Sequence, residues 1–332
     1  MTEPQLLCLR DLAVEFNTRQ GLARVINGLD LELSAGETLG IVGESGCGKS
    51  MTALSIMRLL PPTGYIARGE IQLRGLNLLT LNEEEMRKIR GKNISMVFQE
   101  PMTSLNPVYT VGNQVAEALN AHLELDGPST TKRVIDVFSA VGIPHPERRV
   151  GAYPHQLSGG LRQRVMIAMA LICEPDVLIC DEPSTALDVT VQAQVLDVLR
   201  DLRDKTGTAI IMITHDMGVI AEMADRVLVM YAGRKVEYGP TVDVITRPIH
   251  PYTIGLINCV PHVTGKPDLD RQPLPEIPGI IPALTELGRG CAFEPRCSLA
   301  QSRCKAEEPL MVDKNPGHGA ACWVTAGEGT VK

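Results

Sequence analysis

Residues 43–50 read Gly-Glu-Ser-Gly-Cys-Gly-Lys-Ser, a segment whose small residues and single lysine suit the binding of phosphate. Glycine tolerates the turns that aim backbone N–H groups at phosphate oxygens, and the lysine adds a positive charge. The spacing matches the phosphate-binding loop G-x-x-x-x-G-K-[ST], in which the last hydroxyl ligates Mg²⁺. We therefore expect a nucleoside triphosphate to contact Gly43, Glu44, Ser45, Gly46, Cys47, Gly48, Lys49, Ser50 and Met51.

Two adjacent acids supply a second set of groups for the same chemistry. Asp181 and Glu182 follow the apolar run Val177 to Cys180, which is typical of a buried strand. At the end of such a strand, Asp181 can hold Mg²⁺ through water, and Glu182 can polarise the water that attacks the terminal phosphate. The two motifs predict hydrolysis of a nucleoside triphosphate, but kinases, GTPases and helicases would fit them as well.

The segment Leu157 to Gln163, LSGGLRQ, distinguishes among these classes. It resembles the signature sequence of ATP-binding cassette (ABC) ATPases, and this resemblance implies that the nucleotide is ATP. In that family the serine and glycines, here Ser158, Gly159 and Gly160, donate hydrogen bonds to the γ-phosphate held on a second cassette. The commonest pattern in the family has glutamine at the fifth position, where this chain has Leu161. Importers of the oligopeptide group often carry an apolar residue there.

Four further residues resemble landmarks of the same family. Gln99 resembles the Q-loop glutamine, which contacts Mg²⁺ or water and connects to the membrane subunits. Asp188 ends a segment resembling the D-loop at the dimer interface, and His215 resembles the switch histidine that contacts the γ-phosphate. Phe16 resembles the aromatic residue that stacks on adenine, with a packed core residue as the alternative. The resemblance thus implies Glu182, His215 and Gln99 as catalytic residues and Ser50, Gln99 and Asp181 as Mg²⁺ ligands.

Apolar runs separated by segments of helical periodicity predict an α/β fold with a mostly parallel, buried sheet. Alternating polarity in Leu6 to Phe16 and in Glu70 to Leu73 predicts an antiparallel N-terminal sheet, so the whole is mixed. Helices at Val111 to Leu125 and Ser129 to Val141 predict a helical subdomain over about residues 100–158. The family resemblance implies the ABC-type P-loop ATPase fold. The buried strands are expected at Thr38 to Val42, Ile94 to Phe98, Val177 to Cys180, Ala209 to Ile213 and Val227 to Met230.

Proline, glycine and cysteine become frequent after about Pro248. We therefore predict a nucleotide-binding domain over residues 1–248 and a loop-rich C-terminal domain over residues 249–332. We also expect the phosphate-binding loop to lie in a core separate from this C-terminal domain.

Four cysteines of this tail are spaced C-x5-C-x6-C-x17-C. The segment has little apolar content from which to form a core, and a cytosolic location disfavours disulfides. Because structural zinc sites usually pair their cysteines more closely, we expect a [4Fe-4S] cluster, with Zn²⁺ or free thiols as alternatives. The predicted ligands are Cys291, Cys297, Cys304 and Cys322, and His318 is a candidate replacement for one of them.

The segments Gln99 to Pro107, His250 to Thr253 and Gly290 to Cys297 resemble the oligopeptide, dipeptide and nickel importer group of bacterial ABC transporters. This resemblance covers nearly the whole chain and is strongest to the ATP-binding subunits of dipeptide importers. It implies a second, non-identical ATPase subunit, two transmembrane permease subunits and an extracytoplasmic substrate-binding protein. Peptides are the expected cargo. Nickel import, or a soluble ABC ATPase of translation or DNA repair, is the alternative.

The composition of the 332-residue chain agrees with a globular protein, since 44% of its residues are hydrophobic and 21% are charged. A net charge of -7 argues against nucleic acid as a partner. The apolar run Val165 to Cys173 is far shorter than the roughly 18 residues that cross a bilayer, and the N-terminus does not resemble a secretory signal. We expect the protein at the cytoplasmic face of the bacterial inner membrane, held there by membrane partners.

Overall fold

The computed structural model describes residues 5–99, 104–183, 188–260 and 276–324. The chain forms two compact units, each built from segments that are distant in sequence. The predicted domain boundary at residue 248 stays a prediction. The first unit comprises Met1–Cys8, Leu31–Thr38 and Ile71–Ile213, and the second comprises Leu9–Asp30, Leu39–Glu70 and Thr214–Lys332.

Three parallel strands lie at the centre of the first unit. β6 (Ile94–Val97), β7 (Val177–Asp181) and β8 (Ala209–Ile213) are neighbours in that order. Every residue of these strands is buried, which explains why the strands read as continuous apolar runs rather than as alternating patterns. The expected strands in this part of the chain are confirmed to within one residue at each end.

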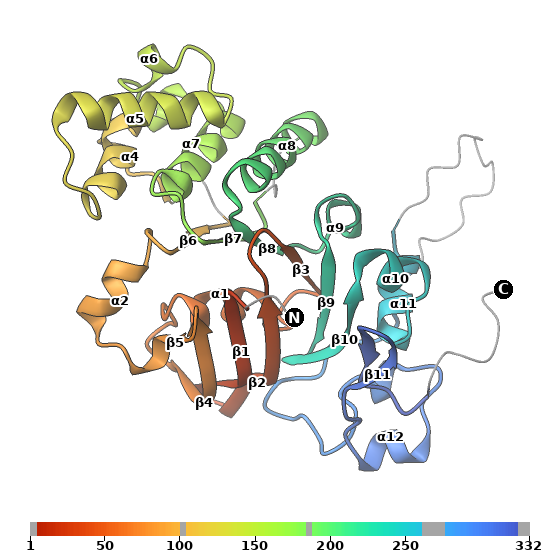
Figure 1. Ribbon diagram of the computed structural model, residues 1–332. Coiled ribbons are helices and arrows are strands. Elements are labelled where there is room, and N and C mark those ends of the chain that lie inside the picture. The colour runs from red at the N-terminus through yellow and green to blue at the C-terminus, as the bar shows by residue number, and fades with distance from the viewer. Residues whose placement is uncertain (1–4, 100–103, 184–187, 261–275, 325–332) are drawn as a thin grey trace, which may run out of the picture. The chain divides into compact units, whose positions relative to one another are not determined.

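Helices make up most of the rest of the first unit. Four of them, α4, α5, α6 and α7, pack against one another as the yellow-to-green group in Figure 1. This group is the helical subdomain that the predicted fold class includes. The helices are α2 (Glu83–Ile89), α4 (Val111–Asn120), α5 (Gly127–Ala140), α6 (Pro146–Arg149), α7 (Gly159–Leu171) and α8 (Val189–Thr206), with 3₁₀ turns η1 (Leu78–Thr80) and η2 (Pro154–Gln156).

Capping and burial explain where the two predicted helices begin and end. The Asp126 side chain accepts a hydrogen bond from the backbone N–H of Ser129 at 2.8 Å and so caps the N-terminus of α5. The first turn of α5 also contains a proline, a residue that suits the start of a helix. The preceding helix α4 ends at Asn120 rather than at the expected Leu125. Leu123 and Leu125 are both exposed, so burial does not favour extending the helix over them.

A four-stranded sheet near the N-terminus has the order β2-β1-β4-β5. The predicted alternation is seen at the end of β4, where Ile71 and Leu73 are buried between more exposed residues, but not along β1, where residues 7–9 and 12–14 are buried in runs. β4 and β5 pair in antiparallel register, with Gln72 opposite Asn77. The strands are β1 (Leu7–Thr18), β2 (Gly21–Leu33), β4 (Gly64–Leu73) and β5 (Leu76–Asn77).

The second unit contains a sheet that the C-terminal tail extends. Parallel strands β3 and β9 are followed by the antiparallel strands β10, β12 and β11. The tail therefore shares a sheet with the strand that leads into the phosphate-binding loop, and the expectation of separate cores is wrong. The strands are β3 (Thr38–Val42), β9 (Arg226–Tyr231), β10 (Arg234–Pro240), β11 (Val312–Asn315) and β12 (His318–Ala320). The helices are α1 (Lys49–Ile56), α9 (Met217–Met223), α10 (Thr241–Thr246), α11 (Pro251–Asn258) and α12 (Ser302–Ala306), with the 3₁₀ turn η3 (Glu294–Arg296).

A buried carboxylate fastens the last strand of the tail to β10. Glu237 is fully buried and accepts hydrogen bonds from the backbone N–H groups of Ile249 and His250, each at 2.8 Å. Its Oε1 also lies 2.8 Å from Nε2 of His318, which is itself buried. The carboxylate is thus well satisfied, and His318 is committed to it rather than lining the cysteine pocket.

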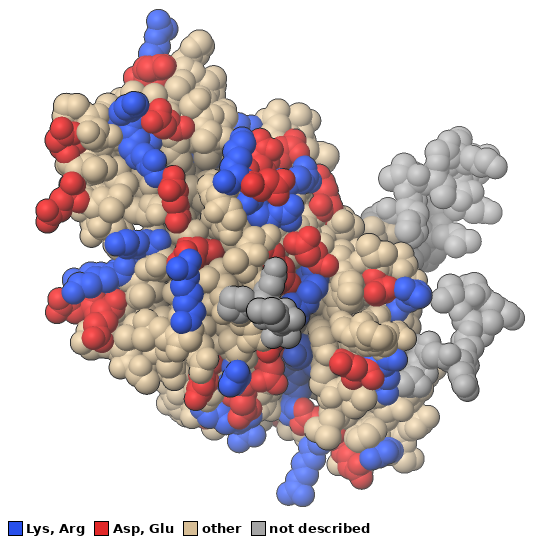
Figure 2. Space-filling view, viewed as in Figure 1, with Lys and Arg blue, Asp and Glu red and all other residues tan. Residues whose placement is uncertain are grey.

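Charges of both signs are mixed over the face drawn in Figure 2, where blue and red side chains adjoin. The described residues include ion pairs between exposed side chains, such as Arg133 with Glu174 and Lys205 with Asp201. This face has no broad basic area of the kind that grips a phosphate backbone. Within the described ranges, no helix has the length and apolar character needed to span a membrane.

Candidate nucleotide site

The phosphate-binding loop connects β3 to α1, as the sequence predicted. Its glycines are required by space and by conformation. A Cβ atom on Gly43 would lie 2.3 Å from the carbonyl oxygen of Met230, and one on Gly48 would lie 2.8 Å from that of Val25. Both glycines also have positive φ angles, of 153° and 107°, which residues with side chains rarely adopt.

Lys49 is the first residue of α1 and is buried. Its ammonium group donates hydrogen bonds to the carbonyl oxygens of Gly43 at 2.7 Å and of Glu44 at 3.1 Å. These contacts place a full positive charge inside the loop, next to the N-terminus of a helix whose dipole also favours an anion.

Cys47 is a residue of the loop itself. Its thiol is buried, and its Sγ would be 2.7 Å from a Cβ atom on Gly43. Burial raises the pKa of the thiol, although the nearby Lys49 charge opposes the shift. A neutral, covered thiol is a poor nucleophile, so Cys47 acts as a small buried residue.

The predicted acids lie at the end of β7. Asp181 is its last residue and is buried. Glu182 follows with a φ of 50°, a left-handed conformation that costs a non-glycine residue on the order of 1 kcal/mol. Its backbone N–H donates to the carbonyl oxygen of Ile213 at 2.8 Å, and its Oε2 accepts a hydrogen bond from Nε2 of Gln99 at 2.8 Å. Adjacent strands therefore bring the predicted base and the predicted Q-loop glutamine together.

The signature segment begins α7. Ser158 caps this helix by accepting a hydrogen bond from the Leu161 N–H at 3.4 Å, and both Ser158 and Gly159 are exposed. A Cβ atom on Gly160 would lie 2.7 Å from Cγ1 of Val191, so glycine is needed where α7 approaches α8. The helix N-terminus and the serine hydroxyl are open to a binding partner.

The remaining predicted residues are distributed over both units. Asp188 caps α8 through a 2.9 Å hydrogen bond from the Val191 N–H, whereas residues 184–187 of the predicted D-loop lie outside the described residues. His215 is exposed and follows β8. Phe16 is half-buried, and its ring packs on Gly64, where an added Cβ would lie 2.5 Å from ring atom Cζ. The phosphate-binding loop, Phe16, His215 and the four tail cysteines belong to the second unit, and the other predicted site residues belong to the first.

Sequence reasoning missed two residues that hold the phosphate-binding loop. The backbone N–H of Glu44 donates to the hydroxyl of Tyr252 at 2.7 Å. The guanidinium of Arg296 pairs with both carboxylate oxygens of Glu44, at 2.7 and 3.0 Å. Tyr252 belongs to the segment from His250 to Thr253 that resembled the importer group, but nothing local in the sequence indicates its contact with the loop.

The four tail cysteines line one pocket, together with His250 and Trp323. None of the four forms a disulfide. Burial raises the pKa of the Cys291 thiol, although the backbone N–H groups of Phe293 and Glu294 stabilise its thiolate. Burial and the neighbouring cysteines raise the pKa of Cys322 to about 11. In the described part of the chain, no group of three or more His, Cys, Asp or Glu is arranged to hold a metal ion. The expected metal site is therefore not preformed among these residues.

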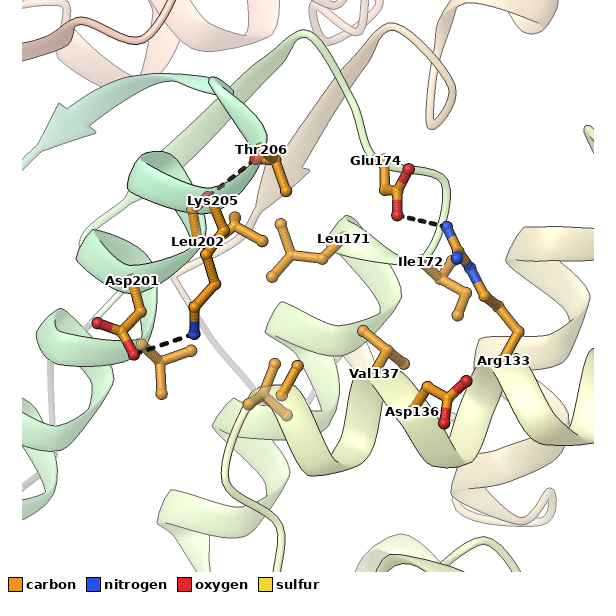
Figure 3. Close-up of a pocket in the computed structure, with 13 residues that line it drawn as sticks. Arg133, Asp136, Val137, Leu171, Ile172, Glu174, Asp201, Leu202, Lys205 and Thr206 are labelled. Carbon is orange, nitrogen blue, oxygen red and sulfur yellow. Dashed lines mark hydrogen bonds and ion pairs between the residues drawn. The ribbon is translucent and has the colours of Figure 1, made fainter.

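A separate pocket of about 220 Å³ lies among α5, α7 and α8 of the first unit (Figure 3). Its lining is mainly apolar. Arg133 pairs with Glu174 on one side and Lys205 pairs with Asp201 on the other, at 2.6 and 3.4 Å. None of the predicted site residues lines it, so it adds nothing to the nucleotide chemistry.

Known proteins resemble this chain in two regions and over nearly its full length. Residues 26–185 match the family described as "ABC transporter", and residues 236–304 match "Oligopeptide/dipeptide transporter, C-terminal region". The dipeptide transport ATP-binding protein DppD of Bacillus subtilis is 47% identical over 321 residues, which cover 96% of this chain and 95% of DppD. The oligopeptide transport ATP-binding protein OppD of Escherichia coli is 48% identical over 318 residues, covering 96% and 93%.

Among solved structures, the dimeric ATP-binding cassette MJ0796, in a post-hydrolysis state with ADP and Pi, superposes with a TM-score of 0.65. It is 26% identical and covers 71% of this chain and 98% of its own. This similarity supports the assignment of the fold.

Proposed function

The chain belongs to the ATP-binding subunits of ABC transporters, and from that membership we propose that it energises the import of peptides into a bacterial cell. As a transporter ATPase it hydrolyses ATP to ADP and phosphate. The observation that carries the peptide cargo is the match of residues 236–304 to the C-terminal region of oligopeptide and dipeptide transporters. Nickel import, the alternative from the sequence, is not favoured by relatives named for peptide transport.

We propose that the loop residues bind the β- and γ-phosphates and that Glu182 accepts the proton of the attacking water. The loop supplies the Lys49 charge and the Ser50 hydroxyl. Water attacks the γ-phosphorus, the bond to the β-phosphate oxygen breaks, and ADP leaves. The hydrogen bond from Gln99 orients the Glu182 carboxylate for this proton transfer. Ser50, Gln99 and Asp181 would hold a Mg²⁺ ion, which would neutralise part of the phosphate charge. His215 is proposed to contact the γ-phosphate, and Phe16 is proposed to stack on adenine.

The exposed start of α7 supports a role for a second cassette. Ser158, Gly159 and Gly160 are proposed to contact ATP held by a partner ATPase subunit, with Asp188 at the interface. The full assembly would contain a non-identical ATPase subunit, two permease subunits and an extracytoplasmic binding protein. The chain would then work at the cytoplasmic face of the inner membrane.

Cargo is tested by copurifying the chain with its native permeases and binding protein and reconstituting the complex in vesicles. We expect ATP-dependent uptake of labelled dipeptides or oligopeptides, and no uptake of ⁶³Ni²⁺ above that of vesicles without ATP. Nickel uptake without peptide uptake would contradict the proposed cargo. Failure to copurify with any permease would contradict the role in transport.

The tail cysteines are further proposed to hold a [4Fe-4S] cluster. Four thiols of suitable donor type line one pocket, and backbone N–H groups lie against the sulfurs, as the 3.5 Å contact from Gln301 to Cys304 illustrates. Because burial raises the pKa of the Cys291 and Cys322 thiols, a metal would have to displace protons from these two side chains.

Anaerobically purified protein is expected to be brown and to contain about four iron atoms per chain. Cys291→Ser should remove the iron, whereas Cys259→Ser should retain it, because Cys259 follows directly after α11 and does not line the pocket. Iron, zinc and sulfide analysis of the three proteins checks this. A colourless wild-type protein with one zinc, or with no metal, would refute the cluster.

A further inference from the structure

Residue Glu44 of the phosphate-binding loop is held at several atoms by residues of the same unit. Its carbonyl oxygen accepts from Lys49 Nζ at 3.1 Å, and its backbone N–H donates to the Tyr252 hydroxyl at 2.7 Å. Its carboxylate forms a two-point pair with Arg296. Tyr252 and Arg296 both lie beyond residue 248, so the C-terminal segment fixes the loop at the residue that also contacts the phosphate-binding lysine.

Arg296 is itself held in a fixed position. Its side chain is 3% exposed, compared with 27% for Glu44. Nε donates to the carbonyl oxygen of Pro278 at 2.9 Å, and Nη2 donates to that of Ile277 at 3.1 Å. The guanidinium also lies 6.0 Å from the ring centroid of Phe293. These contacts fix the orientation of the Arg296 side chain relative to the C-terminal segment. The pair with Glu44 therefore fixes the loop relative to that segment.

An aromatic cluster supports both contacts. The ring centroids of Tyr231 and Tyr252 are 4.7 Å apart, and Phe293 lies 5.2 Å from the first and 5.4 Å from the second. Tyr231 ends β9, Tyr252 lies in α11, and Phe293 stands two residues after Cys291. The cysteine segment is thus packed against the elements beneath the loop, and Arg296 directly precedes Cys297.

The ion pair between Glu44 and Arg296 affects nucleotide binding because Glu44 is negatively charged. A carboxylate in the loop repels the negatively charged phosphates of ATP, and the repulsion acts strongly at short range and partial burial. Arg296 neutralises that carboxylate and holds both of its oxygens through hydrogen bonds. Without Arg296, the free Glu44 carboxylate would compete with phosphate for Lys49.

We propose that Arg296 is a positioning residue for ATP binding, which acts by neutralising and orienting Glu44. The order of the C-terminal cysteine segment then sets the affinity of the phosphate-binding loop, whether or not that segment holds a metal. This inference rests on the proposed role of the loop in binding ATP.

The test is an equilibrium titration of the full-length chain with a non-hydrolysable ATP analogue and Mg²⁺. Arg296→Gln is expected to weaken binding roughly tenfold, as loss of a charge-assisted pair implies. Adding Glu44→Gln to this variant should restore most of the affinity, because the repelling carboxylate is then gone. Rescue of this kind would not follow if Arg296 only stabilised the tail.

Arg303→Gln is the matched control. Arg303 lies in the same cysteine segment, but its contacts are with Glu307 at 3.0 Å and with the Trp323 ring at 3.5 Å, both within the tail. Its variant should bind the analogue as the wild type does. A wild-type affinity for a folded Arg296→Gln, or no rescue by Glu44→Gln, would overturn the proposal. If Arg296→Gln does not fold, Glu44→Gln alone is titrated instead: because the repelling carboxylate is gone, its affinity should be at least that of the native chain, and weaker binding would overturn the proposal.

Lys49→Ala separates this inference from the proposed site. If Lys49→Ala loses binding while Arg296→Gln does not, only the positioning role of Arg296 fails. If Lys49→Ala binds the analogue normally, the loop is not the nucleotide site and both proposals fail.

Discussion

Replacing Lys49 by alanine is expected to lower ATP affinity at least tenfold and to stop turnover by the assembled transporter. The ammonium group lies within the loop, where it contacts the carbonyl oxygens of Gly43 and Glu44. Loss of one charge-assisted phosphate contact costs roughly 1.5 to 3 kcal/mol, which is about 10- to 150-fold in affinity. Titration with a fluorescent ATP analogue and a phosphate-release assay measure the two effects.

Lys205→Ala is the control for this substitution. Lys205 is exposed on α8 and pairs with Asp201 at 3.4 Å, within one turn of the same helix. Because an exposed ion pair contributes little, ATP binding and hydrolysis should be unchanged. Normal ATPase activity of Lys49→Ala in the complex would reject the phosphate-binding loop as the site.

Glu182→Gln should retain ATP binding and slow hydrolysis by about 10² to 10⁴-fold, the usual contribution of a general base. Glutamine keeps the size of the side chain, and its amide oxygen can still accept the hydrogen bond from Gln99. It cannot take the proton of the attacking water. Single-turnover hydrolysis measures the loss, and the expected product is a pair of cassettes held closed with ATP.

Glu174→Gln is a close control because Glu174 shares the unusual backbone of Glu182. Their φ angles are 51° and 50°, and both residues lie near the ends of β7. Glu174 instead pairs with the exposed Arg133. Its variant should hydrolyse ATP at the native rate. Equal rates for both variants would remove Glu182 from its catalytic role.

The sequence predicted the buried strands well because their pattern is local. A strand covered on both faces needs a run of apolar residues, and β3 and β8 have the predicted bounds. The phosphate-binding loop was equally predictable, since glycine spacing and the following helix occur within one short segment. The predicted end of α4 was wrong because helical periodicity continued over Leu123 and Leu125, which are exposed.

The contacts between the C-terminal segment and the loop could not be predicted in this way. Glu44 meets Tyr252 and Arg296 across separations of 208 and 252 residues, and a composition rich in proline and cysteine does not indicate such contacts. The same composition led to the wrong expectation of separate cores. His318 was also considered beside Cys322 because they are close in sequence, but its ring reaches the buried Glu237. In each case tertiary packing decides the partner.

ATP hydrolysis by this chain is the proposed energy source for peptide uptake. The most direct measurement follows labelled dipeptide uptake and phosphate release together in vesicles containing the complete transporter, with native chain or Glu182→Gln. The prediction is that the native complex accumulates peptide only with hydrolysable ATP, and that Glu182→Gln assembles and binds ATP but loses both signals. Peptide accumulation that continues in the Glu182→Gln complex at the native rate would contradict the account.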